Sequence, residues 1–495
     1  MPIMDEPTSL DPQIADSNSE KLVAANCYEG LVRIMADGTI GKGVATDWNI
    51  SDDGLTYTFK LRNNSHWAMF SGHKAVLGEN YEDTFDITVK AEDFKFGIER
   101  TLSEQTGSAD APLFSAVKSI STPDDFTIVF NLSYADDNFL YALTNPGAMP
   151  CDEEFFNLTN GKYGLDAKYL LCNGPFHVSK WTEKTSVKLA KNNEYNGESS
   201  VSPSSVTFYI NNDDSEVADK MNSVTYDVAF LSSSQFSSIE NKKDLNSVAV
   251  QNVTYSFIFN QNDNNYRNKN MRLAFCRSCD TSSLFDSQSD ISKADGIVPP
   301  SCKIGGEDYR NGNAAELLSY DETLAKKNFN DALLELGSSS VETTILCTEQ
   351  YEPFVKQMVQ KLQKTLGVKF VSTVKVVSES DLESAVNDGN YSVAFYPFKA
   401  KSSFAGEIIE GFDQNNIFGY ESDVLSQKIR NIKNNSGSLE GERSAVADAE
   451  NYLVSEAVIM PVFYENSYFV TSKKTSGIYF YSSADNVCFI NAKKS

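Results

Sequence analysis

The chain has 495 residues, which at roughly 150 residues per domain corresponds to about three domains or one large two-lobed body. Hydrophobic residues make up 41% of the chain, which suffices for a large core. The 43 Lys and Arg against 68 Asp and Glu give a net charge of −25. This negative charge argues against nucleic-acid binding and against charge-driven docking on an anionic membrane. The longest apolar run, residues 457–464, is far shorter than the ~20 residues that a membrane-spanning helix needs.

Short strands and helices are predicted along the first half of the chain. Residues 55–61 and 126–132 alternate apolar and polar side chains, the period of a half-buried strand. Residues 90–100 place Phe94 and Ile98 on one face of a helix, and another helix is expected at 19–31. Later in this half we expect a strand at 186–190, strands at 206–210 and 228–231, and a helix at 215–221 between the last two. That strand–helix–strand order predicts a βαβ unit.

The polar stretch 260–270 predicts a boundary, after which strands and helices alternate regularly. The expected strands are 343–347, 368–377 and 391–395, and the expected helices between them are 351–366 and 381–387. This order predicts a mostly parallel sheet with helices on its faces, followed by a helix at 442–454 and a strand at 458–464. Ligands of such sheets bind at the carboxyl ends of the strands, here the loop that starts at Tyr396.

Common catalytic and metal-binding motifs are absent from the sequence. None of the three histidines begins an H-E-x-x-H, and no nucleophile elbow, P-loop or D-[ST]-G is present. His66 and His73 are expected to be solvated imidazoles in a loop. Cys276 and Cys279 form a C-x-x-C without a second ligand pair for zinc, so we expect no metal and no cofactor. A disulfide such as Cys151–Cys172 is expected if the compartment is oxidising.

A resemblance to a known family runs along nearly the whole chain. The stretches that carry it are Leu10-Asp11-Pro12, Tyr28 to Arg33, Trp48, Ser51 to Arg62, Trp67, Val89 to Asp93, Asn173 to Phe176, Trp181, Asn192, Tyr195, Asn260, Met271 to Ala274, Val298 to Pro300 and Met460 to Phe463. In their order and spacing they resemble the family 5 extracellular solute-binding proteins, the oligopeptide- and dipeptide-binding components of bacterial ABC importers.

The resemblance implies an α/β, periplasmic-binding-protein-like fold, a two-lobed Venus flytrap that closes around its solute. The first lobe would comprise residues 1–40, 170–254 and 466–495, with an extra inserted subdomain at 41–169. The second lobe would comprise residues 255–465. The two crossings between the lobes would lie near 253–261 and 460–465.

The same resemblance implies the role and the partners. The chain would be a non-enzymatic, monomeric, extracytoplasmic protein that captures oligopeptides or a similar small solute and delivers them to an ABC permease and its ATPase. Family members are cell-surface lipoproteins or periplasmic proteins, so a lipid anchor and a leader would precede this sequence, which opens without a signal-peptide pattern. Two alternatives stay open, namely a peptide-signal sensor on the same fold and a secreted acidic hydrolase such as a glycosidase.

The resemblance also indicates where the solute would bind. The candidate ligand-binding residues are Ser9, Leu10, Asn18, Ser19, Asn260, Gln261, Tyr396, Phe398, Lys399, Lys401 and Ser402. Peptide binders of the family commonly pair the amino terminus of the peptide with an aspartate in the loop that here starts at Tyr396. This loop instead carries Lys399 and Lys401 and no acid. The two lysines either address a carboxylate of the ligand or are solvated on the rim.

Overall fold

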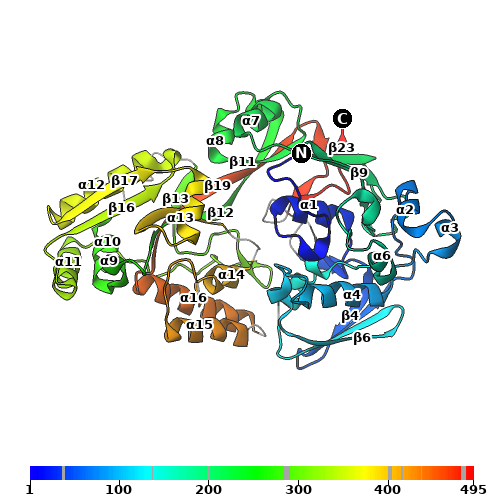
Figure 1. Ribbon diagram of the computed structural model, residues 1–495, viewed down its shortest axis with the longest axis horizontal. Helices are drawn as coiled ribbons and strands as arrows, with labels where there is room; N and C mark the ends of the chain where they lie inside the picture. The colour runs from blue at the N-terminus through cyan, green and yellow to red at the C-terminus, as the bar shows by residue number, and fades with distance from the viewer. Residues whose placement is uncertain are drawn as a thin grey trace. The chain divides into compact units, whose positions relative to one another are not determined.

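The computed structural model describes residues 1–35, 39–136, 138–197, 200–281, 290–399, 404–413, 416–435, 438–480 and 487–495. The chain divides into two compact units (Figure 1). Unit 1 is Met1–Ala249 with Ser467–Ser495, and unit 2 is Val250–Asn466. The chain passes from one unit to the other within two long strands, β12 (Leu245–Phe259) and β19 (Ile459–Ser472).

A four-stranded sheet lies near the amino terminus of unit 1. Its strands in spatial order are β1 (Pro2–Ile3), β10 (Ser205–Ile210), β9 (Ser186–Lys191) and β8 (Phe176–Thr182). Only the β1–β10 pair is parallel, and the other pairs are antiparallel. Helix α1 (Asn18–Cys27) packs against β8 and contributes buried Leu22 and Val23 to the core that the sheet covers.

A second four-stranded sheet of unit 1 is antiparallel throughout. Its order is β4 (Ala45–Ile50), β5 (Thr56–Leu61), β7 (Thr127–Leu132) and β6 (Val117–Asp124). Helix α4 (Ala91–Leu102) covers one face, because Phe94 and Ile98 on one side of the helix are fully buried together with Phe59 and Phe130 of the sheet. The strand pattern and the helical stripe predicted for these segments are therefore confirmed.

Short elements complete unit 1. The remaining helices are α2 (Lys74–Leu77), α3 (Tyr81–Thr84), α5 (Phe139–Ala142), α6 (Glu153–Leu158), α7 (Asp214–Asn222) and α8 (Ser233–Ser238), with 3₁₀ turns at Pro12–Ile14, Ser71–His73, Ala111–Phe114, Pro146–Ala148, Ala167–Tyr169 and Lys242–Asp244. The remaining strands are β2 (Val32–Ile34), β3 (Ile40–Lys42), β11 (Val228–Ser232), β20 (Thr475–Ser476), β21 (Tyr479–Phe480), β22 (Val487–Cys488) and β23 (Lys493–Lys494).

Unit 2 is built on a seven-stranded sheet with the order β11, β19, β12, β18 (Val393–Lys399), β16 (Val341–Cys347) and β17 (Phe370–Val376), in which β13 (Ile291–Lys293) also pairs with β19 and β11 belongs to unit 1. β16 is parallel to both β17 and β18, as predicted, whereas β12 runs antiparallel to β18. Alternate residues of β12 enter different cores: Phe257 and Phe259 pack on one side and Ile258 on the other. Both faces of the sheet are therefore covered.

Helices form the two outer layers of unit 2. One face is covered by α10 (Lys269–Ser278), α11 (Glu322–Leu336) and α12 (Glu352–Leu366), and the other by α13 (Glu379–Asn387), α14 (Ala405–Glu410), α15 (Asp423–Asn434) and α16 (Leu439–Ser455). Figure 1 shows α15 and α16 side by side. Smaller elements are α9 (Asn264–Arg267), a 3₁₀ turn (Glu349–Tyr351), β13 (Ile291–Lys293), β14 (Lys303–Ile304) and β15 (Glu307–Asp308).

Two predictions about unit 1 are wrong for reasons that lie in distant contacts. β10 and β11 belong to different sheets, so the predicted βαβ unit does not form. Helix α1 ends at Cys27 and not near residue 31. The Glu29 amide donates to the Asn173 side chain over 3.0 Å, and the Glu29 carboxylate pairs with Arg62, which holds this segment away from a helical course.

The predicted solvated histidine pair and the predicted disulfide are also wrong. His73 is fully buried, with Nε2 3.1 Å from the Leu170 carbonyl oxygen. All eight cysteines are free. Cys151 Sγ accepts a hydrogen bond from Arg100 over 3.5 Å, whereas Cys172 lies beside Cys27.

Within the described ranges, none of the helices combines the length and the apolar character that crossing a bilayer would require.

Candidate functional site

A single carboxylate holds the loop that precedes α1. Glu20 Oε1 accepts hydrogen bonds from the Thr8 amide (2.7 Å), the Thr8 hydroxyl (2.8 Å) and the Ser9 amide (3.3 Å). Glu20 Oε2 accepts from the amides of Asp16 (3.0 Å) and Ser17 (3.2 Å), and Ser17 caps the helix in return. Burial alone would raise the pKa of Glu20, but these donors outweigh it and lower the pKa. The loop therefore has one well-defined position.

The four candidate residues of unit 1 differ in what they leave available to a ligand. Ser9 and Leu10 are buried, with the Ser9 hydroxyl accepting from the Asp11 amide and the Leu10 amide donating to the Gly164 carbonyl. Ser19 is buried as well and accepts from the amide of residue 5. Asn18, by contrast, is exposed at the first position of α1.

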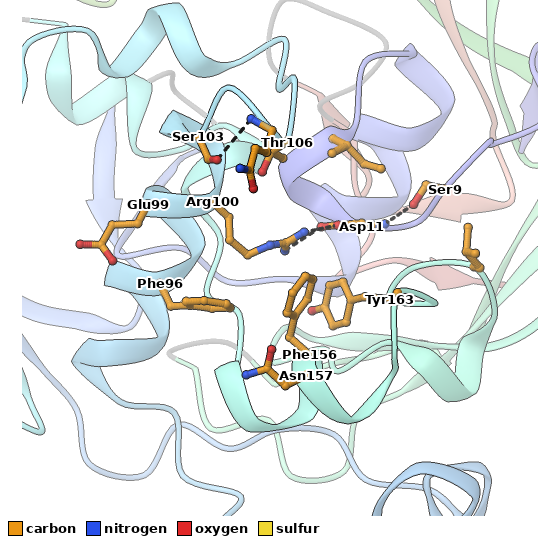
Figure 2. Close-up of a pocket in the computed structure, with 14 residues that line it drawn as sticks. Ser9, Asp11, Phe96, Glu99, Arg100, Ser103, Thr106, Phe156, Asn157 and Tyr163 are labelled. Atoms are coloured by element: carbon orange, nitrogen blue, oxygen red, sulfur yellow. Dashed lines mark hydrogen bonds and ion pairs between the residues drawn. The ribbon is translucent and has the colours of Figure 1, made fainter.

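A cavity of about 660 Å³ lies beside this loop, entirely within unit 1 (Figure 2). Its wall contains an ion pair: Arg100 of α4 extends toward Asp11 of the loop, with Nη2 2.5 Å from Oδ2 and Nη1 3.2 Å from Oδ1. Arg100 Nη1 also donates to Gln13 Oε1 over 2.6 Å. The guanidinium lies over the Phe156 ring at 4.1 Å from its centroid and over Tyr163 at 5.4 Å.

The Arg100–Asp11 pair is a neutral, structural part of that wall. Both side chains are nearly buried, at 11% and 5% exposure. Burial by itself would lower the pKa of Arg100, but the Asp11 carboxylate reverses this and holds the pKa well above its usual range. The pair is bidentate and stacked on aromatic rings, a geometry in which each charge compensates the other.

The rim of the cavity is different in character from its wall. Figure 2 shows Glu99 leaving the same helix as Arg100 but turned outward from the ion pair, with the Phe96 ring below it. Glu99 is exposed and Phe96 is half-buried. Two large aliphatic residues of the lining, Ile14 and Leu165, are 38% and 53% exposed. The rim thus offers apolar surface next to one carboxylate.

In unit 2, the segment that starts at Tyr396 is a strand and not the predicted loop. β18 continues to Lys399, paired with β12 through Ser256 opposite Tyr396 and Val253 opposite Lys399. Lys399 is exposed at the carboxyl end of the strand, whereas the Phe398 ring packs on Phe412 and Phe418. The predicted site residues Lys401 and Ser402 lie outside the described residues.

Asn260 and Gln261 lie at the opposite edge of the unit 2 sheet. The Asn260 side-chain nitrogen donates to the Tyr391 and Gly389 carbonyls, just before β18, over 2.8 and 2.9 Å, and its Oδ1 accepts from the Asn262 amide over 2.9 Å. The chain enters unit 2 at Val250, about ten residues earlier, which in an extended strand is roughly 30 Å away. The structure therefore does not place these two residues near Lys399 or at a crossing.

A carboxylate that the sequence analysis missed lies at the carboxyl edge of this sheet. Glu465 Oε1 accepts from the Tyr351 hydroxyl over 2.5 Å and from Gln350 over 3.4 Å, directly beyond the end of β16. Burial first, and then the neighbouring carboxylates of Glu379 and Asp290, raise the pKa of Glu465. These residues come from four separate segments, so no local pattern could have indicated the cluster.

No group of three or more His, Cys, Asp or Glu side chains suited to a metal ion occurs among the residues that the structure describes.

Comparison with known proteins identifies the family. Residues 39–418 match the model of the bacterial extracellular solute-binding proteins, family 5 Middle. The dipeptide-binding protein DppE of Bacillus subtilis is 24% identical over 503 residues, covering 96% of this chain and 88% of that protein. Among solved structures, Listeria monocytogenes OppA bound to peptide superposes with a TM-score of 0.77 at 20% identity over 100% of this chain and 98% of that one. A dipeptide-binding protein from Pseudoalteromonas in complex with Met-Leu gives 0.78 at 18% identity over 100% and 99%. The chain therefore belongs to the family 5 bacterial extracellular solute-binding proteins.

Proposed function

We propose that this protein captures peptides outside the cytoplasm and delivers them to the permease of an ABC importer. The observation that carries the proposal is the match over 96% of the chain to a relative described as dipeptide-binding. A likeness that extends along the whole chain supports a shared role more strongly than one confined to a single segment.

We propose candidate ligand contacts for each unit separately. In unit 1 they lie in the Ser9–Leu10 loop that Glu20 holds in place, with Asn18 at the start of α1 as the exposed side chain. In unit 2 they are Tyr396, Phe398 and Lys399, at the carboxyl end of a strand that is parallel to its neighbour, where ligands of α/β sheets bind. Lys399 is exposed there, so its ammonium group is available to a carboxylate of a peptide.

We further propose that the protein acts as a monomer attached to the outer face of the membrane by a lipid anchor, with the permease and the ATPase subunits as its partners. Size-exclusion chromatography with light scattering tests the monomer, and metabolic labelling with a palmitate analogue of cells that express the full gene tests the anchor.

The central experiment is to identify what the protein carries. The purified protein is denatured and the released molecules are analysed by mass spectrometry. Calorimetry with the peptides found should then give saturable binding, and incubation with the same peptides should return them intact. Release of a non-peptide solute, or cleavage of the peptides in proportion to protein concentration, would overturn the proposal. A Lys399→Ala variant should bind the same peptides about fivefold more weakly.

A further inference from the structure

We propose, building on peptide capture as the function, that the unit 1 cavity selects peptides that carry a cationic side chain, an arginine or a lysine. The receiving groups are the Glu99 carboxylate and the Phe96 ring on the rim of the cavity. Neither residue contributes to the ion pair in the wall.

Helix α4 places the Phe96 ring and the Glu99 carboxylate side by side. Phe96 and Glu99 are three residues apart, so both line the cavity from one face of the helix. A ring and a carboxylate at this spacing can receive a guanidinium or ammonium group, the ring by cation–π attraction and the carboxylate by a charged hydrogen bond.

The charges of the lining leave one negative charge uncompensated. Asp11 and Arg100 neutralise each other within the wall. Glu99 makes no ion pair within 4 Å in the described part of the chain; the nearby Lys95 pairs with Glu92 over 2.7 Å and attracts Glu99 only at longer range. The cavity therefore carries the charge of Glu99, which is complementary to a cationic ligand group.

The wall of the same cavity already holds a guanidinium in this way. Arg100 lies over the Phe156 ring at 4.1 Å and pairs with the Asp11 carboxylate. The rim repeats that combination of ring and acid, with Glu99 exposed and Phe96 half-buried, and with no Lys or Arg besides Arg100 among the lining residues.

The size and the apolar parts of the cavity suit the stem of such a side chain. About 660 Å³ lies within the range of small-ligand pockets, and a peptide residue would occupy only part of it. Ile14 and Leu165 on the rim expose aliphatic surface against which the methylene groups of arginine or lysine would pack.

The experiment compares peptides that differ by one charge. A peptide recovered with the protein is synthesised with arginine at each position in turn and with citrulline, a neutral isostere, at the same position. At one position the arginine peptide should bind about fivefold more tightly than the citrulline peptide, as expected for an exposed ion pair plus a cation–π contact. Glu99→Gln should bring the affinities for the arginine and citrulline peptides to within about twofold of each other.

Matched variants separate the cavity from the overall charge of the protein. Glu104→Gln removes the same charge from an exposed residue just after α4 that does not line the cavity, so the preference should persist. Phe96→Leu keeps an apolar side chain but removes the ring and should weaken the preference partly. Thermal unfolding of each variant checks that the fold is intact.

The outcomes distinguish this inference from the proposed function. If the wild-type protein binds the arginine and citrulline peptides equally at every position, the cavity inference is wrong while peptide capture stands. If Glu99→Gln and Glu104→Gln lose the preference for the arginine peptide equally, the cavity inference is also wrong, because long-range charge would then explain the selectivity. If no peptide binds at all, both proposals fail.

Discussion

The surroundings of two carboxylates, one in each unit, shift their pKa values in opposite directions. Glu20 accepts five hydrogen bonds from the loop and helix start around it, and these lower its pKa although burial acts against them. Glu465 accepts from Tyr351 and Gln350, and burial together with the nearby Glu379 and Asp290 raises its pKa. The charge of Glu20 stabilises the fold, whereas the charge of Glu465 opposes it.

The opposite pKa shifts of Glu20 and Glu465 show how each unit uses its buried polar groups. Glu20 positions a loop and has little capacity left for a ligand. The Glu465 carboxylate lies at the carboxyl edge of the sheet, where burial disfavours its charged form.

The largest effect is expected at Glu450, a satisfied carboxylate of unit 2. It is 1% exposed, pairs with Arg310, and accepts from the Tyr309 hydroxyl and from the amides of Ile297 and Val298. Glu450→Ala leaves the guanidinium buried without its partner, so we expect a loss of about 3–5 kcal/mol in the free energy of unfolding, measured in urea. The control Glu322→Ala removes an exposed acid and should show no measurable change. Similar curves for both variants would contradict the assignment.

His73 gives the corresponding test with a buried base. Burial lowers its pKa from 6.5 to about 4, so the native state holds the neutral ring. Stability is then complete above pH 6.5 and falls as the pH drops toward 4, by about 3 kcal/mol in all. His73→Gln removes this titration, and the difference between the two proteins in urea unfolding should narrow steadily from pH 7 to pH 4. A constant difference would show that His73 does not titrate in this range.

A smaller effect is expected at Glu20. Glu20→Ala leaves the amides of Thr8, Ser9, Asp16 and Ser17 without their acceptor, which should lower the free energy of unfolding by about 2 kcal/mol. Because the pKa is lowered in the native state, this stabilisation is present above the unfolded value of 4.5 and is lost as the pH falls through the native value. The free energies of unfolding of the wild type and of Glu20→Gln, measured in urea at pH 7 and at pH 3, give the part of this stabilisation that depends on the charge. An equal difference in the free energy of unfolding between the two proteins at both pH values would contradict the role of the charge.

The regular elements could be predicted because their signals are local. The alternation in residues 56–61 and the apolar stripe of α12 need no knowledge of distant segments, and β5 and α12 begin within one residue of the predicted positions. The end of α1 could not be predicted in this way, because it depends on Asn173 and Arg62. The different sheets of β10 and β11 also depend on partners that no local pattern reveals.

The site was predictable only in part, for the same reason. The loop of Ser9 and Leu10 borders the unit 1 cavity, but the cavity also needs Arg100, Phe156 and Tyr163 from three other places in the chain. One signal was available, the recurrence of polar and aromatic residues along a single face of α4. Asn260 and Gln261 stay predicted ligand contacts; the structure shows that the Asn260 side chain bonds to the main chain of residues 389 and 262.

The smallest effect, and the one that bears most directly on the contrast, is expected at Glu465. Glu465→Gln keeps an oxygen that can accept from the Tyr351 hydroxyl but removes a charge that burial and two carboxylates disfavour. Because the pKa is raised in the native state, ionisation of Glu465 opposes folding increasingly as the pH rises through 4.5 toward the native value. The Gln variant should therefore be more stable than the wild type at pH 7 by about 0.5–1 kcal/mol. At low pH the two proteins should be equally stable. Urea unfolding at both pH values measures the difference, and Glu349→Gln, an exposed acid near the same strand end, serves as the control. If Glu465→Gln is instead destabilised at pH 7, the carboxylate is a structural group like Glu20, and the contrast between the two units does not hold.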